Sequence, residues 1–164
     1  MAAVSSTLYT NAIIITVDPQ RRIFPCGALL VEGDRIAAVG ESSSLERSLP
    51  SNCTRVNLQR KIVIPGLING HVHLVQSVMR GIAEDMNLHQ WASCSIWPLE
   101  VSYVGDDGYV AAKLAMAEMI KTGTTCFLEP MLPSSAQIGR VADAVEEIGI
   151  RACLVRIAYI LAFE

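Results

Sequence analysis

The sequence contains no cluster of basic residues that could bind a polyanion. Its 13 lysines and arginines stand against 16 acidic residues, which gives a formal net charge of -3 at pH 7. Proteins that bind nucleic acid or an acidic membrane surface usually carry a basic patch or tail. The charge balance therefore argues against both partners. Because 51% of the 164 residues are hydrophobic, the chain can still bury a sizeable core.

Long apolar runs are also missing. No uninterrupted run approaches the roughly 20 residues that a membrane-spanning helix needs. The apolar stretch at residues 152–163 is short and contains Arg156. Residues 1–10 carry no basic group ahead of an apolar run, which argues against a secretory signal. We therefore expect a soluble, cytoplasmic protein that does not enter a membrane.

The cysteines form no recognisable pair. They are 5 in number and scattered, and no two of them stand in a CxxC spacing. An odd, dispersed set indicates neither a disulfide framework nor a thiolate zinc site. We expect small buried hydrophobic side chains in a reducing compartment. The positions are Cys26, Cys53, Cys94, Cys126 and Cys153.

Short β-strands dominate the first part of the chain. β-branched and apolar residues predict strands over residues 8–17, 26–32, 36–39, 54–58 and 61–64, with a tight hairpin at residues 32–35. Residues 40–52 are polar and serine-rich, which indicates a loop with one helical turn. Pro65-Gly66 then marks a boundary. We interpret residues 1–64 as a small all-β lobe of the sandwich type.

Helices and strands alternate after this boundary. Strands are expected at residues 67–74, 124–128 and 150–158. A short helix over residues 88–97 should end at Pro98, and a second covers residues 106–121 before Gly123. A third helix, capped by Ser134 or Ser135, should run to residue 148 before Gly149. This order predicts an α/β fold with a parallel sheet and right-handed crossovers.

Two histidines one residue apart end the apolar segment at residues 61–74. Successive side chains on a strand point to opposite faces, so His71 and His73 should share one face and Val72 the other. Two adjacent imidazoles can hold a divalent metal, or they can be ordinary histidines that form hydrogen bonds. A catalytic zinc usually has three protein ligands. The third histidine, His89, lies in the predicted short helix, where an exposed polar role is simplest.

The segment Pro65-Gly-Leu-Ile-Asn-Gly-His-Val-His-Leu74 closely resembles the opening barrel strand of the metal-dependent amidohydrolase superfamily. Residues 80–91 and 96–100 resemble the branch that contains the S-adenosylhomocysteine and methylthioadenosine deaminases, with the chlorotriazine hydrolases as relatives. The resemblance covers about residues 8–158. It implies a (β/α)8 TIM barrel, of which residues 65–164 would supply about three units. The apolar residues on both sides of the histidine pair suit a barrel strand that is buried on both faces.

The resemblance also implies roles for single residues. His71 and His73 would be metal ligands, with zinc or another divalent ion such as iron as the cofactor. Trp91 would line the substrate pocket, or else anchor a short helix to the core. Glu100 would receive ribose hydroxyls, or else be an exposed glutamate beside a helix. Arg156 would bind the far end of the substrate, or else be a structural arginine in a salt bridge.

The implied reaction is metal-assisted hydrolysis, in which hydroxide attacks a ring carbon of a small heterocyclic molecule and ammonia leaves. The family's later metal ligands and proton-transferring residues would lie beyond residue 164, so we assign no catalytic residue within the chain. Glu129 matches a position where the family often has an acid, and we assign it no role. We expect a truncated and inactive form with two open sheet edges and an uncovered apolar face.

Other functions stay open at this point. The chain could be a non-catalytic fragment that associates with a full-length homologue through its open sheet edge. It could derive from a dechlorinase of triazine-like rings, although Glu100 argues against this because such rings carry no ribose. A simple metal-binding module is weaker, since two ligands give little affinity. A homo-oligomer is compatible with each of these functions.

Overall fold

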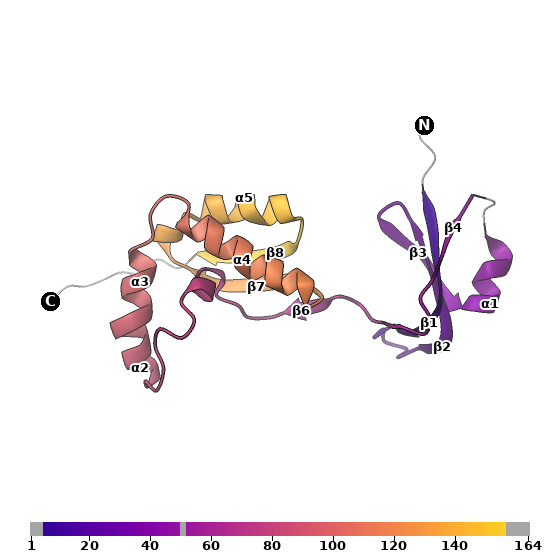
Figure 1. The fold of residues 1–164 in the computed structure, drawn as a ribbon, viewed down its shortest axis with the longest axis horizontal. Helices are drawn as coiled ribbons and strands as arrows, with labels where there is room; N and C mark the ends of the chain where they lie inside the picture. Colours follow the sequence, from indigo (N-terminus) through magenta and orange to yellow (C-terminus); the bar gives the residue numbers. More distant parts are fainter. Residues whose placement is uncertain (1–4, 50–51, 157–164) are drawn as a thin grey trace. The chain divides into compact units, whose positions relative to one another are not determined.

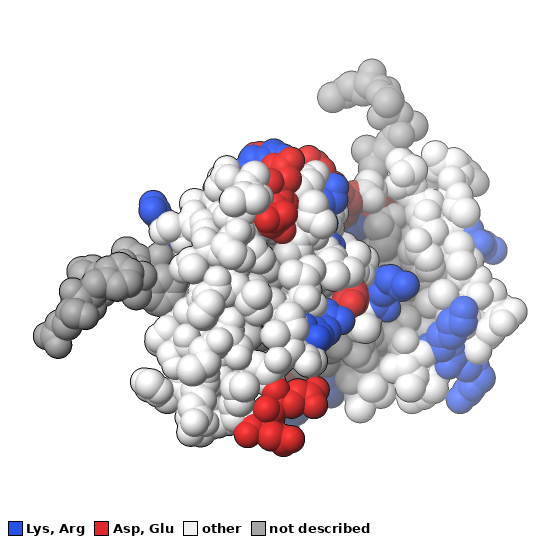
Figure 2. Space-filling view, turned by 60° about the vertical axis from the view of Figure 1, so that its left-hand side comes forward, with Lys and Arg blue, Asp and Glu red and all other residues white. Residues whose placement is uncertain are grey.

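The computed structural model describes residues 5–49 and 52–156. The chain divides into two compact units, Met1–Pro65 and Gly66–Glu164, and each is described by itself. No helix in the described ranges is both long and apolar enough to cross a membrane. In the view of Figure 2, charged residues of both signs form small separate groups on a mostly uncharged surface.

The first unit contains one five-stranded sheet. Its strands are β1 (Ser6–Ile15), β2 (Ile23–Glu32), β3 (Arg35–Glu41), β4 (Thr54–Asn57) and β5 (Ile62–Val63). The order is β3-β2-β1-β4, and β5 also pairs with β1. β1, β2 and β3 are antiparallel neighbours, whereas β4 and β5 run parallel to β1. All five expected strands are therefore present, with shifted ends.

A single helical turn, α1 (Ser42–Leu45), follows β3 and leads into the 3₁₀ turn η1 (Glu46–Ser48). Ser42, the first residue of α1, is buried, and its hydroxyl donates a hydrogen bond to the Gly27 carbonyl at 2.8 Å. Leu8, Ala12 and Ala28 are almost fully buried in this unit. The described residues of the unit form one sheet, so the two-layered sandwich stays a prediction.

The second unit is a parallel three-stranded sheet covered by helices. β6 (Leu67–Asn69), β7 (Thr124–Leu132) and β8 (Arg151–Arg156) lie in the order β6-β7-β8. α4 (Asp107–Lys121) is the last helix of the segment between β6 and β7, and α5 (Ile138–Ile148) connects β7 to β8. Both helices lie over one side of the sheet (Figure 1). The parallel α/β arrangement expected from the alternating pattern is confirmed. The eight-stranded barrel and the handedness of its crossovers stay predictions.

The core of this unit lies between the helices and the sheet. Met116, Phe127, Leu132, Val141 and Ala144 are among its buried residues. A side chain of the Phe or Met class contributes about 1.5–3 kcal/mol when it is fully buried. This packing fixes β7 against α4 and α5. β7 carries Glu129, which lies beside His73.

The opposite side of the sheet is uncovered among the described residues. Ile68 is 76% exposed and Val155 is 43% exposed, and both point away from the side that carries Phe127. The uncovered apolar face expected for about three barrel units is therefore present among the described residues, because both crossover helices pack on one side. The expectation that the first barrel strand is buried on both faces is wrong. Cys126 and Cys153 on neighbouring strands are half-buried and exposed, respectively.

Several local predictions are wrong. None of the cysteines is buried: Cys26, Cys94 and Cys153 are exposed, and Cys53 and Cys126 are intermediate.

Pro98 does not end the helical segment, which runs through α2 (Leu88–Trp91), the π-helical η3 (Ala92–Ile96) and α3 (Trp97–Val101). Proline is tolerated there because it follows the π-helical turn η3, which interrupts the regular ladder of backbone hydrogen bonds just before Pro98.

The start of α5 also differs from the prediction. Ser134 and Ser135 form the 3₁₀ turn η4 (Ser134–Ala136) and do not cap the helix. Gln137, in the left-handed conformation with φ 53°, stands between this turn and α5. The helix ends at Gly149 with φ 75°, as the sequence predicts. Of the strand expected at residues 150–158, positions 157 and 158 lie outside the described residues.

Candidate functional site

The two histidines of the HxH motif lie just after a strand. β6 ends at Asn69, so the expectation of a strand reaching residue 74 is wrong. The Asn69 side chain accepts a hydrogen bond from the His71 backbone N–H at 3.1 Å, which turns the chain out of regular pairing. One more contact with β7 follows, because the Val72 N–H donates to the Leu128 carbonyl at 3.0 Å. The histidines therefore stand at the carboxyl end of the sheet.

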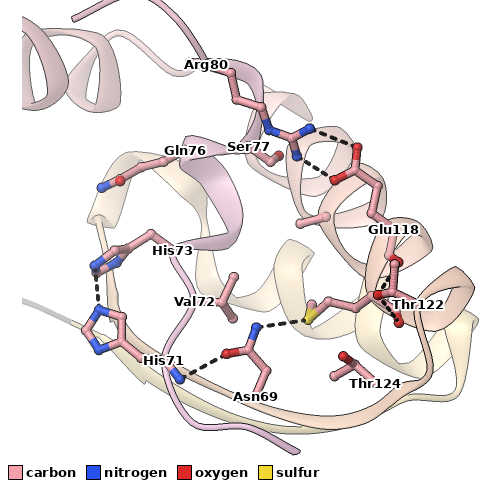
Figure 3. A pocket seen from close by; sticks show the side chains of 12 residues that line it. Asn69, His71, Val72, His73, Gln76, Ser77, Arg80, Glu118, Thr122 and Thr124 are labelled. Atoms are coloured by element: carbon pink, nitrogen blue, oxygen red, sulfur yellow. Dashed lines mark hydrogen bonds and ion pairs between the residues drawn. The ribbon is translucent and has the colours of Figure 1, made fainter. Parts of the chain in front are cut away.

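The alternation expected for a strand survives in this short loop. Val72 packs against the hydrophobic core, while the imidazoles of His71 and His73 face each other beside it (Figure 3). Their Nε2 atoms are 3.1 Å apart and their rings meet edge to face, with an interplanar angle of 88°. His71 is exposed, and the side chain of His73 retains 24% of its exposure.

The geometry of this pair fits a shared divalent ion. Nitrogen ligands of zinc lie about 2.0–2.1 Å from the metal, so two of them in a tetrahedral site are about 3.3 Å apart. The observed separation of 3.1 Å is close to that value. Imidazole suits both zinc and iron. In the part of the chain that the structure describes, no cluster of three or more His, Cys, Asp and Glu side chains could complete such a site.

A buried carboxylate lies against His73. Glu129 on β7 is 0% exposed, and its Oε1 is 3.5 Å from His73 Nδ1. Glu129 Oε2 accepts from the Leu74 backbone N–H at 2.6 Å, and its Oε1 accepts from the Met131 N–H at 2.8 Å. The sequence had suggested no role for Glu129, and this contact with His73 was not predicted.

A second buried carboxylate, Glu100 on α3, belongs to the same electrostatic group. It is 1% exposed, and its Oε1 accepts from the Gln76 side-chain amide at 2.8 Å. Burial raises the pKa of Glu100 above its usual value, the hydrogen bond from Gln76 and the charge of His73 lower it, and nearby Glu129 raises it. Glu100 Oε2 is buried without a hydrogen-bond partner among the described residues. The expected alternative of an exposed glutamate is therefore wrong.

The remaining candidate residues lie elsewhere in the unit. Trp91 is the last residue of α2 and is half-buried. Arg156, the last residue of β8, is exposed, and its Nη2 donates to Ser134 Oγ at 3.3 Å. His71 and His73 line a cavity of about 540 Å³, whereas Arg156 lines another of about 510 Å³ beside the start of α5. His89 is exposed on α2. Neither cavity includes Trp91.

The sequence profile of the amidohydrolase family matches residues 62–161, which is more than half of the chain. The chain belongs to the amidohydrolase family. The match includes the histidine pair and all of β6, β7 and β8. Residues 27–50 also match a bacterial imidazolonepropionase-like composite domain, so the profile similarity continues into the first unit.

Curated relatives are similar over most of this chain. A 5-methylthioadenosine/S-adenosylhomocysteine deaminase from Halothermothrix orenii is 37% identical over 142 residues, which cover 87% of this chain and 32% of the relative. A protein of the same name from Bacillus cereus is 33% identical over 150 residues, covering 92% of this chain and 34% of the relative. The chain therefore spans about a third of the length of these relatives.

Solved structures of deaminases share the fold. An adenosine deaminase from Xanthomonas campestris with bound zinc superposes with a TM-score of 0.72 and 25% sequence identity, covering 92% of this chain and 33% of that one. A guanine deaminase from Bradyrhizobium japonicum superposes with a TM-score of 0.74 and 20% identity, covering 92% and 35%. The α/β architecture of the chain is thus that of amidohydrolase deaminases.

Proposed function

We propose that this chain supplies the first metal-binding strand of a hydrolase that removes ammonia from an adenosine-like or related heterocyclic substrate. The observation that carries the proposal is the convergence of His71 Nε2 and His73 Nε2 to 3.1 Å at the carboxyl end of β6. Reactive groups of parallel barrels gather at this end. The relatives named as deaminases support the choice of reaction.

The proposed cofactor is zinc or another divalent ion such as iron, held in part by His71 and His73. When bound, such an ion would lower the pKa of water toward about 7 and so make hydroxide available. The overall reaction replaces an exocyclic C–N bond with a C–O bond and releases ammonia. Within the described residues, His71 and His73 would orient the ion, and the apolar packing of Val72 would hold both rings in place.

The substrate-binding roles remain proposals. Glu100 has the strongest support, because its buried carboxylate has an oxygen without a hydrogen-bond partner among the described residues. A ligand hydroxyl that donated to this oxygen would satisfy it, which fits a ribose group. Trp91 and Arg156 would contribute a wall of the pocket and a contact with the distal part of the substrate. Both assignments rest on family resemblance.

We also propose that residues 65–164 form the first part of an eight-stranded barrel and that the 164-residue polypeptide alone has no turnover. Two imidazoles are fewer than the three protein ligands usual for catalytic zinc, and the described residues offer no larger ligand cluster. The isolated polypeptide should bind zinc weakly for the same reason.

Association with a longer homologue is a second candidate function. The uncovered side of the β6-β7-β8 sheet, with Ile68 76% exposed and Val155 43% exposed, favours it. Apolar surface of this kind commonly marks an interaction site. Co-purification of the chain with a full-length deaminase homologue, lost when Ile68→Asp is introduced, would support this function.

Binding of Co²⁺ as a spectroscopic substitute for zinc tests the proposed metal pair. Wild-type protein should bind Co²⁺, and His71→Ala and His73→Ala should each abolish the signal. The matched control is His89→Ala, because His89 is the third histidine of the chain and is exposed on α2. Binding that survives loss of His71 and His73 would contradict the proposal.

Turnover is tested separately by ammonia release. The purified 164-residue protein, supplied with zinc and with adenosine, S-adenosylhomocysteine or methylthioadenosine, should release no ammonia above the protein-free rate. Robust turnover would refute the proposal that this polypeptide is inactive. It would leave the metal-binding role of the histidines in place.

A further inference from the structure

Glu129 is the buried charged group that the proposed function does not use. It is 0% exposed on β7, and a buried carboxylate is costly unless it is paired and hydrogen-bonded. Two backbone N–H groups bond to it, those of Leu74 and Met131, at 2.6 and 2.8 Å. Its third neighbour is His73, whose Nδ1 lies 3.5 Å from Oε1. Glu129 therefore connects β7 to the histidine loop at two points.

These contacts hold both the backbone and the ring of one histidine. Leu74 directly follows His73, so the Leu74 N–H···Oε2 bond fixes the main chain at the carboxyl side of that residue. The Nδ1 atom of His73 is buried, and no hydrogen bond of the described residues satisfies it. At 3.5 Å from Oε1, it is a few tenths of an ångström beyond ordinary hydrogen-bond length. A small rotation of the ring would close that gap.

The two nitrogens of the His73 ring face different partners. Nδ1 faces Glu129, and Nε2 faces Nε2 of His71 at 3.1 Å. A neutral imidazole carries one N–H, and a carboxylate on one nitrogen leaves the lone pair on the other. Histidines that bind metals commonly donate their second N–H to a carboxylate or a carbonyl.

We infer that Glu129 is a positioning residue that holds His73 in the Nδ1–H tautomer, with its Nε2 lone pair directed beside that of His71 toward a divalent metal. This inference rests on the proposed metal-binding function of the pair. Glu129 does not touch the metal or the substrate in this arrangement. It acts through the orientation of His73 and through the loop at Leu74.

Nitrogen-15 NMR of the metal-free protein tests the inference without any metal. At a pH where imidazole is neutral, wild-type His73 should show the Nδ1–H tautomer. Glu129→Gln should shift His73 toward the Nε2–H tautomer, because a glutamine has one acceptor oxygen for the contacts that two carboxylate oxygens now make. Glu129→Asp, which restores the charge, should recover part of the wild-type tautomer ratio.

Co²⁺ titration supplies the second readout. Glu129→Gln should weaken binding by about 10- to 100-fold, the range typical for loss of a group that orients a metal-binding histidine. The matched control is Glu118→Gln, which removes the same charge; Glu118 lines the cavity of the two histidines but its carboxylate accepts hydrogen bonds from Arg80. It should change neither the tautomer of His73 nor the affinity for Co²⁺.

The outcomes separate this inference from the proposed function. Wild-type His73 in the Nε2–H form overturns the inference, even if Glu129→Gln fails to fold. A folded Glu129→Gln protein with unchanged tautomer and unchanged Co²⁺ affinity also overturns it, and leaves the metal pair intact. If wild-type protein binds no Co²⁺ while His73 keeps the Nδ1–H form, the metal-binding proposal fails and the positioning contact stands.

Discussion

The close approach of α4 to η4 makes Gly108→Ala a sharp test of the packing around the site. Gly108 is the second residue of α4, and a Cβ atom added there would lie 2.5 Å from the Ala136 carbonyl oxygen and 2.8 Å from Ala136 Cα. These are backbone atoms, so no side-chain rotation can relieve the overlap. The turn η4 follows β7, the strand that carries Glu129. The contact therefore helps to place the end of that strand.

The expected size of the effect follows from two opposing terms. Overpacking costs about 1–3 kcal/mol, because helix and turn must move apart. Replacing glycine by alanine within a helix returns about 0.5–1 kcal/mol. The net loss in free energy of unfolding should therefore be about 1–2 kcal/mol. With urea m-values of about 1–3 kcal/mol/M, the unfolding midpoint should fall by about 0.3–2 M.

The matched control is Gly139→Ala. Gly139 is the second residue of α5, and an added Cβ would meet no heavy atom within 4 Å. This variant should be stabilised by up to about 1 kcal/mol through the helix term alone. Both tryptophans, Trp91 and Trp97, belong to this unit, so urea unfolding followed by tryptophan fluorescence reports on it. A Gly108→Ala protein as stable as Gly139→Ala would refute the reasoning.

Two further predictions concern the same unit. Phe127→Ala removes a ring that is 1% exposed in the core under α4 and should cost about 3–5 kcal/mol in urea unfolding; a loss below about 1 kcal/mol would show that the ring is not packed as described. Burial raises the pKa of the Glu100 carboxyl, so the native state binds a proton at Glu100 more readily than the unfolded chain does. Glu100 therefore lowers the free energy of unfolding as pH rises above its usual pKa of 4.5. Glu100→Gln should therefore be more stable than wild type near pH 7, and urea unfolding should show this advantage shrinking toward pH 4.5; a constant difference across this range would contradict the cause assigned to the shift.

Local sequence signals predicted most of the secondary structure. The glycines at positions 123 and 149, with φ of 89° and 75°, end α4 and α5 where the pattern placed them. Pro98 misled the prediction, because its effect depends on whether the preceding turn is regular, and here that turn is π-helical. The end of β6 was also misplaced, since the turn at Asn69 depends on a side-chain bond to the His71 N–H.

The burial of the sheet could not be read from the strands alone. Leu67 and Ile68 are apolar in sequence, and apolar strands in parallel sheets are usually covered on both sides. Among the described residues, α4 and α5 cover one side, and Ile68 stays 76% exposed. The apolar composition of a strand shows that its side chains are suited to burial. Whether they are buried depends on which helices or strands pack on each face of the sheet.

The candidate site shows the same division between local and long-range information. The HxH spacing alone predicted that the two imidazoles share a side, since that depends only on residues two positions apart. Glu129 carried a weaker signal: it stands two residues after Phe127, so strand alternation gives a carboxylate the inward position of a buried aromatic ring. A charge in such a position requires partners, and β6 is a direct neighbour of β7. The identity of those partners depended on the 3₁₀ turn η2 (Leu74–Val78), which brings the Leu74 N–H to the carboxylate from 55 residues away.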